Sequence, residues 1–181
     1  MSDDLLYTVI ITVFGRITIV WTTLPETIVL RVLLPNYQDK LRSEYPQAIQ
    51  SSSERIDDLA EDIASFLEGE DVGFNLDMVD LSLCSQFQRR VIDAEHGVPR
   101  GWVTTYGRIA DHLKRPHSSR AVGRALATNP FPIVIPCHRA IKSNGALGGY
   151  QGGVKMKKQL LEMEGIEFYS SKRVMMNKVY Y

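Results

Sequence analysis

The sequence has few cysteines and no long apolar run. Only two of its 181 residues are cysteine, Cys84 and Cys137, and they are too far apart to form a CxxC pair. With four scattered histidines they give no spacing typical of a zinc site, so we expect no metal and no other cofactor. Apolar runs such as Val9–Phe14 are strand-sized and fall well short of the roughly 20 residues that a membrane helix needs. A membrane protein is therefore not expected.

The start of the chain also lacks the features of a secretory signal. Met1-Ser2-Asp3-Asp4 is acidic where a signal peptide is basic, and no cleavage site of small residues follows a long apolar region. We expect a cytoplasmic protein with free thiols.

The whole chain has a net charge of zero, but its two halves are oppositely charged. Residues 1–80 carry 5 basic and 15 acidic side chains, whereas residues 81–181 carry 16 basic and 6 acidic ones. The halves thus have charges of −10 and +10. This asymmetry indicates either an anionic partner such as nucleic acid for the basic half, or two domains of opposite charge docked together.

Residues 1–80 are expected to form an N-terminal α+β domain. Three β-rich runs, at 6–14, 16–23 and 27–34, predict a meander. The serines at 51–53 can cap a helix, and apolar residues then recur at helical spacing until Gly69 ends it. The carboxylates of this half are expected on the polar face of that helix and in loops.

Residues 81–181 are expected to form a mainly helical domain. Ser85 can cap a helix that runs through Ala94. Thr104 or Thr105 can cap a second helix, which ends before Pro116, and Ser118 or Ser119 a third, which Asn129-Pro130 terminates. Two short helices joined by a tight turn predict a helix-turn-helix.

The third helix presents an exposed face of small and basic side chains. The members of this face are Arg120, Ala121, Gly123, Arg124, Ala125 and Ala127. A glycine inside a helix costs about 1 kcal/mol relative to alanine, so Gly123 indicates a close backbone approach. The approaching group is either another part of the protein or a DNA groove. The two arginines favour DNA.

Cys137 is the candidate nucleophile. It follows an apolar run, Ile133–Ile135, that predicts a short buried strand, and it directly precedes His138. A thiol reacts as its thiolate and needs a base or a positive environment to ionise. Neighbouring side chains of a strand point to opposite faces, so Pro136 must begin a turn if His138 is to act on Cys137. A buried cysteine that only fills core volume is the alternative.

Glu164 stands at an unusual place for a carboxylate. It ends a helix predicted over 154–163, with Gly165 as the C-cap, and an anion there opposes the helix dipole. A compensating partner is expected, and His138 is the available imidazole; a solvated surface glutamate is the alternative. Between them lies a glycine-rich loop, Gly145–Gly153, that is either a ligand-binding loop or a plain linker.

These blocks closely resemble the O6-alkylguanine-DNA alkyltransferase family. The resemblance rests on Ile135-Pro136-Cys137-His138-Arg139, on the preceding Arg120-Ala-Val-Gly and Asn129-Pro130, and on the following Gly149-Tyr150-Gln151-Gly152-Gly153 and Leu160–Gly165. It covers about residues 85–166. It implies an N-terminal ribonuclease-H-like domain and a winged-helix-like C-terminal domain that binds DNA and accepts the alkyl group.

The resemblance further implies direct reversal of DNA damage. An alkyl group would pass from O6-alkylguanine, and from O4-alkylthymine, to Cys137, irreversibly and once per molecule. His138 would act as base through water, Glu164 would orient His138, and Tyr106 would donate to guanine N3. Asn129 would tie the helix-turn-helix to the active-site segment, and Arg120 would fill the gap left by the flipped base. The remaining assigned residues are Ala121, Gly123, Arg124 and Ala125 on the minor-groove helix, with Ser143, Tyr150, Gln151, Gly152 and Gly153 at the pocket.

The implied partner is double-stranded DNA that contains alkylated guanine. The protein is expected to act as a monomer in the cytoplasm or nucleoid, with no membrane partner and no cofactor. Gln88, Gly107, Arg115 and Arg124 depart from the residues that relatives often place there, which puts single DNA contacts in doubt. Three alternatives are open. A non-enzymatic binder of alkylated DNA is disfavoured by the presence of Cys137, and a helix-turn-helix transcription regulator is disfavoured by the alanines of the third helix. A cysteine hydrolase is disfavoured because His138 is directly adjacent to Cys137.

Overall fold

The computed structural model describes residues 5–181, so the acidic start Met1–Asp4 lies outside the described residues. Contacts divide the chain into two compact units. The first contains the residues up to Leu83 together with Pro130–Val134, and the second contains Cys84–Asn129 and Ile135–Tyr181. The sequence predicted one boundary at 80/81. It did not predict that a five-residue segment just before Cys137 returns to the first unit.

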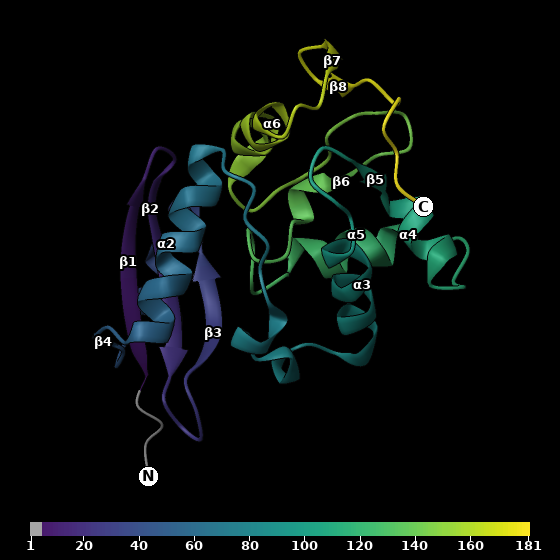
Figure 1. Ribbon diagram of the computed structural model, residues 1–181. Coiled ribbons are helices and arrows are strands. Elements are labelled where there is room, and N and C mark those ends of the chain that lie inside the picture. The colour runs from purple at the N-terminus through teal and green to yellow at the C-terminus, as the bar shows by residue number, and fades with distance from the viewer. Residues whose placement is uncertain (1–4) are drawn as a thin grey trace. The chain divides into compact units, whose positions relative to one another are not determined.

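The first unit is built on a four-stranded sheet. Its strands are β1 (Leu6–Thr12), β2 (Gly15–Thr22), β3 (Ile28–Leu33) and β4 (Ile49–Gln50), in the order β3-β2-β1-β4 (Figure 1). The first three pair antiparallel, which confirms the predicted meander, whereas β4 pairs parallel to β1. Gly15 makes the β1–β2 turn with a φ of +108°, a conformation that favours glycine.

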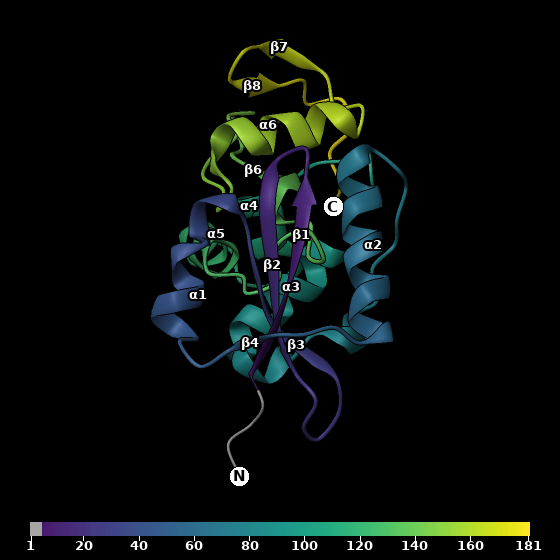
Figure 2. The same cartoon turned by 90° about the vertical axis from the view of Figure 1, so that its left-hand side faces the viewer.

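The helix α2 (Glu54–Glu68) covers this sheet beside β1, as both ribbon views show (Figures 1 and 2). Its buried residues are Ile56, Leu59, Ile63, Phe66 and Leu67, spaced as the sequence predicted. Gly69 ends it in the left-handed region, also as predicted. Ser53 occupies the N-cap position, but its hydroxyl accepts no capping hydrogen bond. The unit is completed by α1 (Asp39–Glu44) and three 3-10 turns, η1 (Pro35–Tyr37), η2 (Leu76–Met78) and η3 (Leu81–Leu83).

The second unit is mainly helical. It contains α3 (Gln86–His96), α4 (Tyr106–His112), α5 (Ser119–Ala127), the 3-10 turn η4 (Cys137–Arg139) and α6 (Gly153–Met163). Two small sheets accompany them: β5 (Thr104–Thr105) with β6 (Ala140–Ile141), and β7 (Phe168–Ser170) with β8 (Arg173–Val174). Ser85 and Thr105 cap α3 and α4 through their hydroxyls as predicted, whereas Ser118 precedes α5 without such a bond.

The core of the second unit joins α3, α4 and α5, which lie together in Figure 1. Val91, Ile109, Val122 and Leu126 interlock there at 4% exposure or less, and Cys137 belongs to the same buried cluster. The candidate nucleophile is thus positioned by the packing of the helix-turn-helix itself.

The predicted strand over Ile133–Ile135 is wrong. The backbone turns there, and Ile133 has a φ of +77°, which a strand does not allow. Instead, Pro130 accepts a hydrogen bond of 2.8 Å from the Val32 amide, so this segment packs within the first unit. An apolar run of three residues carries no periodicity that separates a strand from a buried turn.

Candidate active site

The backbone at Cys137 forms a tight helical turn. The Arg139 amide donates a 2.8 Å hydrogen bond to the Pro136 carbonyl, and residues 137–139 make up η4. With about three residues per turn, consecutive side chains of a 3-10 helix lie about 120° apart and not on opposite faces. The turn expected at Pro136 is therefore present.

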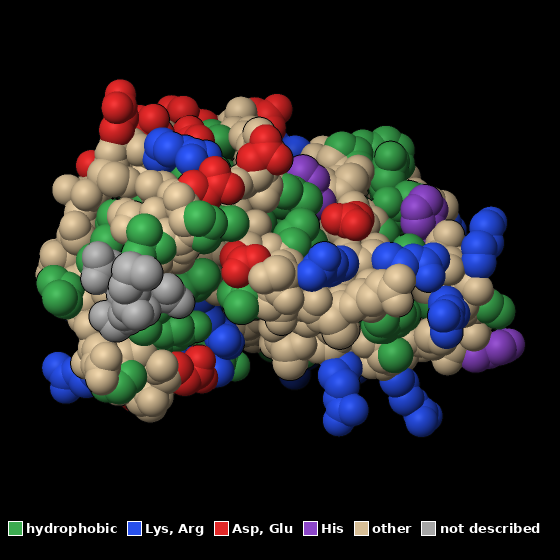
Figure 3. Space-filling view, turned by 90° about the horizontal axis from the view of Figure 1, so that it is seen from below, with side chains coloured by type: hydrophobic (Ala, Val, Ile, Leu, Met, Phe, Trp, Pro, Cys, Tyr) green, Lys and Arg blue, Asp and Glu red, His purple; other side chains and the backbone are tan. Residues whose placement is uncertain are grey.

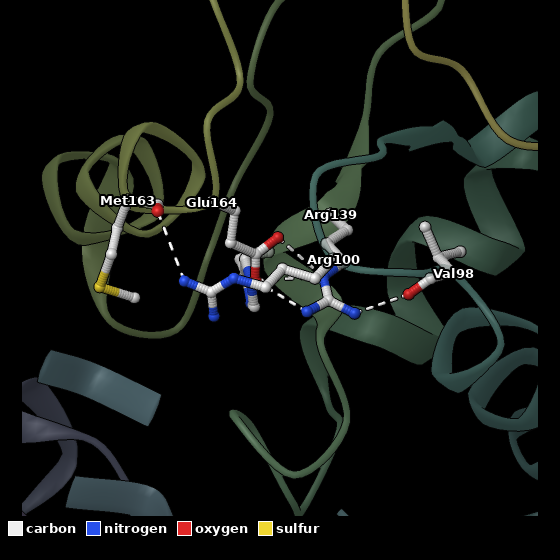
Figure 4. A network of polar contacts seen from close by, with 6 residues as sticks. Val98, Arg100, Arg139, Met163 and Glu164 are labelled. Carbon is white, nitrogen blue, oxygen red and sulfur yellow. Dashed lines mark hydrogen bonds and ion pairs between the residues drawn. The ribbon is translucent and has the colours of Figure 1, made fainter. Parts of the chain in front are cut away.

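Glu164 lies next to His138, as its position at the end of α6 led us to expect. His138 Nε2 and Glu164 Oε1 are 2.8 Å apart, and both side chains are buried. Arg139, which the sequence did not single out, donates to both oxygens of Glu164 and, through Nη1, to the Val98 carbonyl at 2.6 Å (Figure 4). Gly165 follows with a φ of +77°, the C-cap geometry that was predicted.

This network fixes the charges around the imidazole. Burial alone would raise the pKa of Glu164, but the contacts with His138 and Arg139 outweigh it and lower that pKa to about 2. Burial lowers the pKa of His138 below its ordinary 6.5. A neutral imidazole held by an ionised carboxylate can accept a proton at neutral pH.

Cys137 itself is buried, with 5% of its surface exposed. Burial raises the pKa of the thiol to about 11, and a hydrogen bond with the Asn129 side chain opposes this shift. Asn129 is held in turn by Gln151, whose amide nitrogen donates to the Asn129 carbonyl at 2.7 Å. The structure thus brings together three residues that were predicted at the site: Asn129 at the end of the helix-turn-helix, Cys137, and Gln151 of the glycine-rich loop.

Tyr106 lies against that loop at the first residue of α4. Burial, and then the charges of Glu95 and Cys137, raise the pKa of Tyr106 to about 12, so the phenol remains a proton donor. A Cβ added at Gly148 would stand 2.6 Å from the Tyr106 hydroxyl, and Gly148 has a φ of +73°. Gly148 is therefore required at this place. In the sequence it was only one glycine among several.

The remaining loop residues have different surroundings. The Tyr150 ring lies edge-on to His138, with 6.3 Å between ring centroids, and burial raises the pKa of Tyr150 well above 10. Gly152 is the N-cap of α6, and Gly153 begins that helix with a φ of +84°. Ser143 is exposed in the turn after β6.

The exposed side of α5 carries Arg120, Ala121 and Arg124. Ala125 was expected on this face but is buried at 7% exposure, because it packs with the core helices. A groove of about 580 Å³ lies beside α5. It is lined by Ser85, Phe87, Gln88, Arg120, Ala121, Arg124, Ala125 and Thr128. Gln88 does not extend toward a partner, since its amide nitrogen donates to the carbonyls of Ala125 and Thr128.

Gly123 is not explained by packing within the second unit. A Cβ placed there would meet Tyr106 Cδ1 at 3.9 Å, which is an ordinary contact. Alanine would fit in the free protein. Of the two explanations left open by the sequence, close approach of an outside partner is therefore favoured.

Besides Arg139, two charged residues are buried without any indication in the sequence. Glu95 on α3 and Lys157 on α6 are both fully buried. Lys157 Nζ donates to the carbonyls of Ala140, at 2.6 Å, and Gly149, at 3.2 Å. Charged residues on amphipathic helices are usually exposed, so nothing in the sequence signals their burial.

The surface seen in Figure 3 carries a group of Lys and Arg side chains toward its right-hand side. Within residues 5–181, no helix combines the length and apolar character that crossing a membrane requires. The same described residues contain no group of three His, Cys, Asp or Glu side chains placed to hold a metal ion.

Several known proteins are similar to this chain. Residues 86–166 match the family described as 6-O-methylguanine DNA methyltransferase, DNA binding domain. A methylated-DNA–protein-cysteine methyltransferase of Methanothermobacter thermautotrophicus is 50% identical over 111 residues, which are 61% of this chain and 62% of that protein. The match thus spans less than two thirds of that relative's length.

Two further proteins match over more of their length. The methylated-DNA–protein-cysteine methyltransferase of Methanosarcina acetivorans is 35% identical over 126 residues, covering 70% of this chain and 80% of the relative. A crystal structure of Mycobacterium tuberculosis OGT in complex with DNA superposes with a TM-score of 0.75 at 29% identity, covering 87% of this chain and 91% of that one. The fold is accordingly the mixed α and β fold of these proteins. The chain belongs to the methylated-DNA–protein-cysteine methyltransferase family.

Proposed function

We propose that this protein repairs DNA by transferring an alkyl group from O6-alkylguanine, and from O4-alkylthymine, to its own Cys137. The proposal rests on one observation. The buried carboxylate of Glu164 contacts the imidazole of His138, and His138 directly follows Cys137 in the chain. An acid that orients an imidazole next to a thiol is the arrangement of an activated nucleophile. Membership of the family supports the same reaction.

At the alkyl carbon, the reaction forms a bond to sulfur and breaks the bond to oxygen. The Cys137 thiol loses its proton to His138 through a water molecule, and the thiolate sulfur attacks the alkyl carbon. The bond between that carbon and guanine O6 breaks, and a proton from Tyr106 assists the departure of the base. The proton held by His138 then returns through solvent to Tyr106, so the net change is one alkyl group transferred to sulfur and one proton transferred to guanine, and the thioether at Cys137 is permanent. Each molecule therefore acts once, without a metal or a cofactor.

The target base must leave the duplex to reach a buried thiol. Extrusion of a nucleotide costs a few kcal/mol and is easiest for a damaged pair. Arg120, exposed on α5, would occupy the vacated space, while Ala121 and Gly123 allow the helix into the minor groove, which is about 6 Å wide. A protein similar in structure was crystallised in complex with DNA, which supports this assignment.

We assign the finer roles in the same way. The second unit, with its winged-helix-like helix-turn-helix, would bind DNA and carry the transfer, and the ribonuclease-H-like first unit would support it. Tyr150, Gln151, Gly152 and Gly153 would line the base pocket, with Ser143 at its edge. The protein would act as a monomer on double-stranded DNA, in the cytoplasm or nucleoid.

The test is a single-turnover assay with a duplex that contains one O6-methylguanine, followed by peptide mass spectrometry. We expect a methyl group on Cys137, and we expect the guanine in the duplex to have lost its methyl group. Cys84→Ala is the matched control, because it removes the only other thiol and should leave transfer intact. Cys137→Ala should bind the lesion without repairing it. Repair by Cys137→Ala, or an unmodified Cys137 after repair, would contradict the proposal.

A further inference from the structure

The segment Lys178–Tyr181, which we call the strap, has no part in the proposed chemistry. It follows β8 and runs toward α4 (Figure 1). The Val103 amide donates to the Lys178 carbonyl at 3.0 Å, and the Val103 carbonyl accepts from the Tyr180 amide at 2.8 Å. The Thr104 hydroxyl donates to the Tyr180 carbonyl at 3.2 Å. The strap and the stretch at β5 thus pair side by side, in parallel.

The strand β5 connects the strap to both reacting groups. On its other side β5 pairs in parallel with β6, which directly follows η4 and therefore lies three residues after Cys137. At its end β5 leads into α4, whose first residue is Tyr106 and whose N-cap is Thr105. The strap, β5 and β6 are therefore three neighbouring parallel stretches. The phenol of Tyr106 follows the middle one, and the thiol of Cys137 precedes an outer one.

Tyr181 fastens the end of the strap to two helices. Its hydroxyl donates to the Ala94 carbonyl of α3 at 2.8 Å. Its backbone oxygen accepts a hydrogen bond from Arg108 of α4, and its ring lies against the imidazole of His112, with 4.1 Å between ring centroids. Tyr181 thus holds α4 at two places one turn apart. An isolated helix shorter than about 12 residues is marginal in water, so the seven-residue α4 depends on such contacts.

We propose that the strap sets the position of the Tyr106 phenol relative to the Cys137 thiol, and that Tyr181 is a positioning residue for alkyl transfer. The phenol must reach the departing base while the sulfur reaches the alkyl carbon. Misplacing a reacting group by about 1 Å can slow a reaction about 100-fold. The strand β5 is held by β6 on the side of the thiol and by the strap on the other side. This inference rests on the proposed function, because it assigns Tyr106 and Cys137 the roles given there.

The first test separates the transfer step from DNA binding. With a duplex that contains O6-methylguanine in excess, the saturating single-turnover rate reports transfer, and the half-saturating duplex concentration reports binding. We expect Tyr181→Ala to lower the saturating rate about tenfold and to leave the half-saturating concentration unchanged. Tyr181→Phe keeps the ring and loses the bond to Ala94, so its rate should fall less. Tyr169→Ala removes an exposed tyrosine from β7 and is the matched control, with the parental rate.

A double-mutant cycle separates displacement of the phenol from a general loss of stability. If the strap acts through the Tyr106 hydroxyl, Tyr181→Ala should slow transfer no further in a Tyr106→Phe background, which already lacks that group. The same fold-loss in both backgrounds would overturn the proposal. Parental rates in both Tyr181→Ala and Tyr181→Phe would overturn it as well.

Amide hydrogen exchange of the free protein gives a readout that needs no DNA. Tyr181→Ala should speed exchange over residues 103–112, and Tyr169→Ala should not. Unchanged exchange over these residues would contradict the proposed hold of the strap on β5 and α4. A parent protein that never methylates Cys137 would instead refute the proposed function, and faster exchange in Tyr181→Ala would still report the hold on α4.

Discussion

The guanidinium of Arg139 donates to both carboxyl oxygens of Glu164, at 2.9 Å from Nε to Oε2 and 2.8 Å from Nη2 to Oε1. A paired, planar contact of this kind fixes the carboxylate in orientation as well as in charge. His138 meets the same carboxylate at Oε1. The orientation of the imidazole thus depends on a residue that directly follows it in the chain.

Glu164→Gln should destabilise the fold strongly. Removal of one partner of a buried ion pair costs about 3–5 kcal/mol, because the other charge stays buried. Urea unfolding at pH 7 measures the loss. Glu162→Gln on the same helix breaks only an exposed pair with Lys158, for which we expect less than about 1 kcal/mol. Similar losses in the two variants would show that Arg139 finds another partner.

Acid should remove the contribution of Glu164. Its pKa is about 2 in the folded protein and 4.5 ordinarily, so the folded state binds fewer protons than the unfolded state between these values. The stabilisation of the fold by the Glu164 carboxylate is fully present above pH 4.5 and is lost as the pH falls toward 2. The stability difference between the parent and Glu164→Gln, measured by urea unfolding, should therefore shrink between pH 5 and pH 3. A difference that is constant over this interval would contradict the assignment.

Gly148→Ala should impair both folding and alkyl transfer. The added methyl group would stand 2.6 Å from the Tyr106 hydroxyl, and the positive φ adds strain. We expect a loss of about 1–3 kcal/mol of stability, together with slower transfer because the phenol is displaced. Gly149→Ala is the control, since no atom lies within 4 Å of a Cβ placed there. Equal behaviour of the two variants in thermal unfolding and in the methyl-transfer assay would exclude this role for Gly148.

Arg124→Ala should weaken DNA binding in a salt-dependent manner. If this exposed side chain contacts a phosphate, its loss reduces the slope of log affinity against log salt by about one. Fluorescence anisotropy with an undamaged duplex at several salt concentrations gives the slope. Lys155→Ala removes an exposed charge from α6 and is expected to leave the slope unchanged. An unchanged slope in Arg124→Ala would place this arginine outside the phosphate contacts.

Periodic patterns predicted most elements of this fold. The strands of the meander, α2 with its Gly69 stop, and the helices after Ser85 and Thr105 all follow from spacing and capping residues. The two-residue strand β4 and the turn at Ile133 did not, because segments of two or three residues carry no period. At the site, Cys137, His138 and Glu164 could be predicted from reactive residue types. Arg139 and Gly148 could not, because their importance lies in contacts that only the folded chain creates.

The segment Pro130–Val134 limits how this protein can be divided. The chain leaves the second unit after Asn129 and returns at Ile135, two residues before Cys137. Phe131, Ile133 and Val134 are buried within the first unit, at 1% exposure or less. A fragment that starts at Cys84 would keep the helix-turn-helix and the thiol, yet it would expose these three apolar side chains in the stretch that links Asn129 to the nucleophile. We therefore expect the second unit, made without the first, to be less stable than it is in the whole chain.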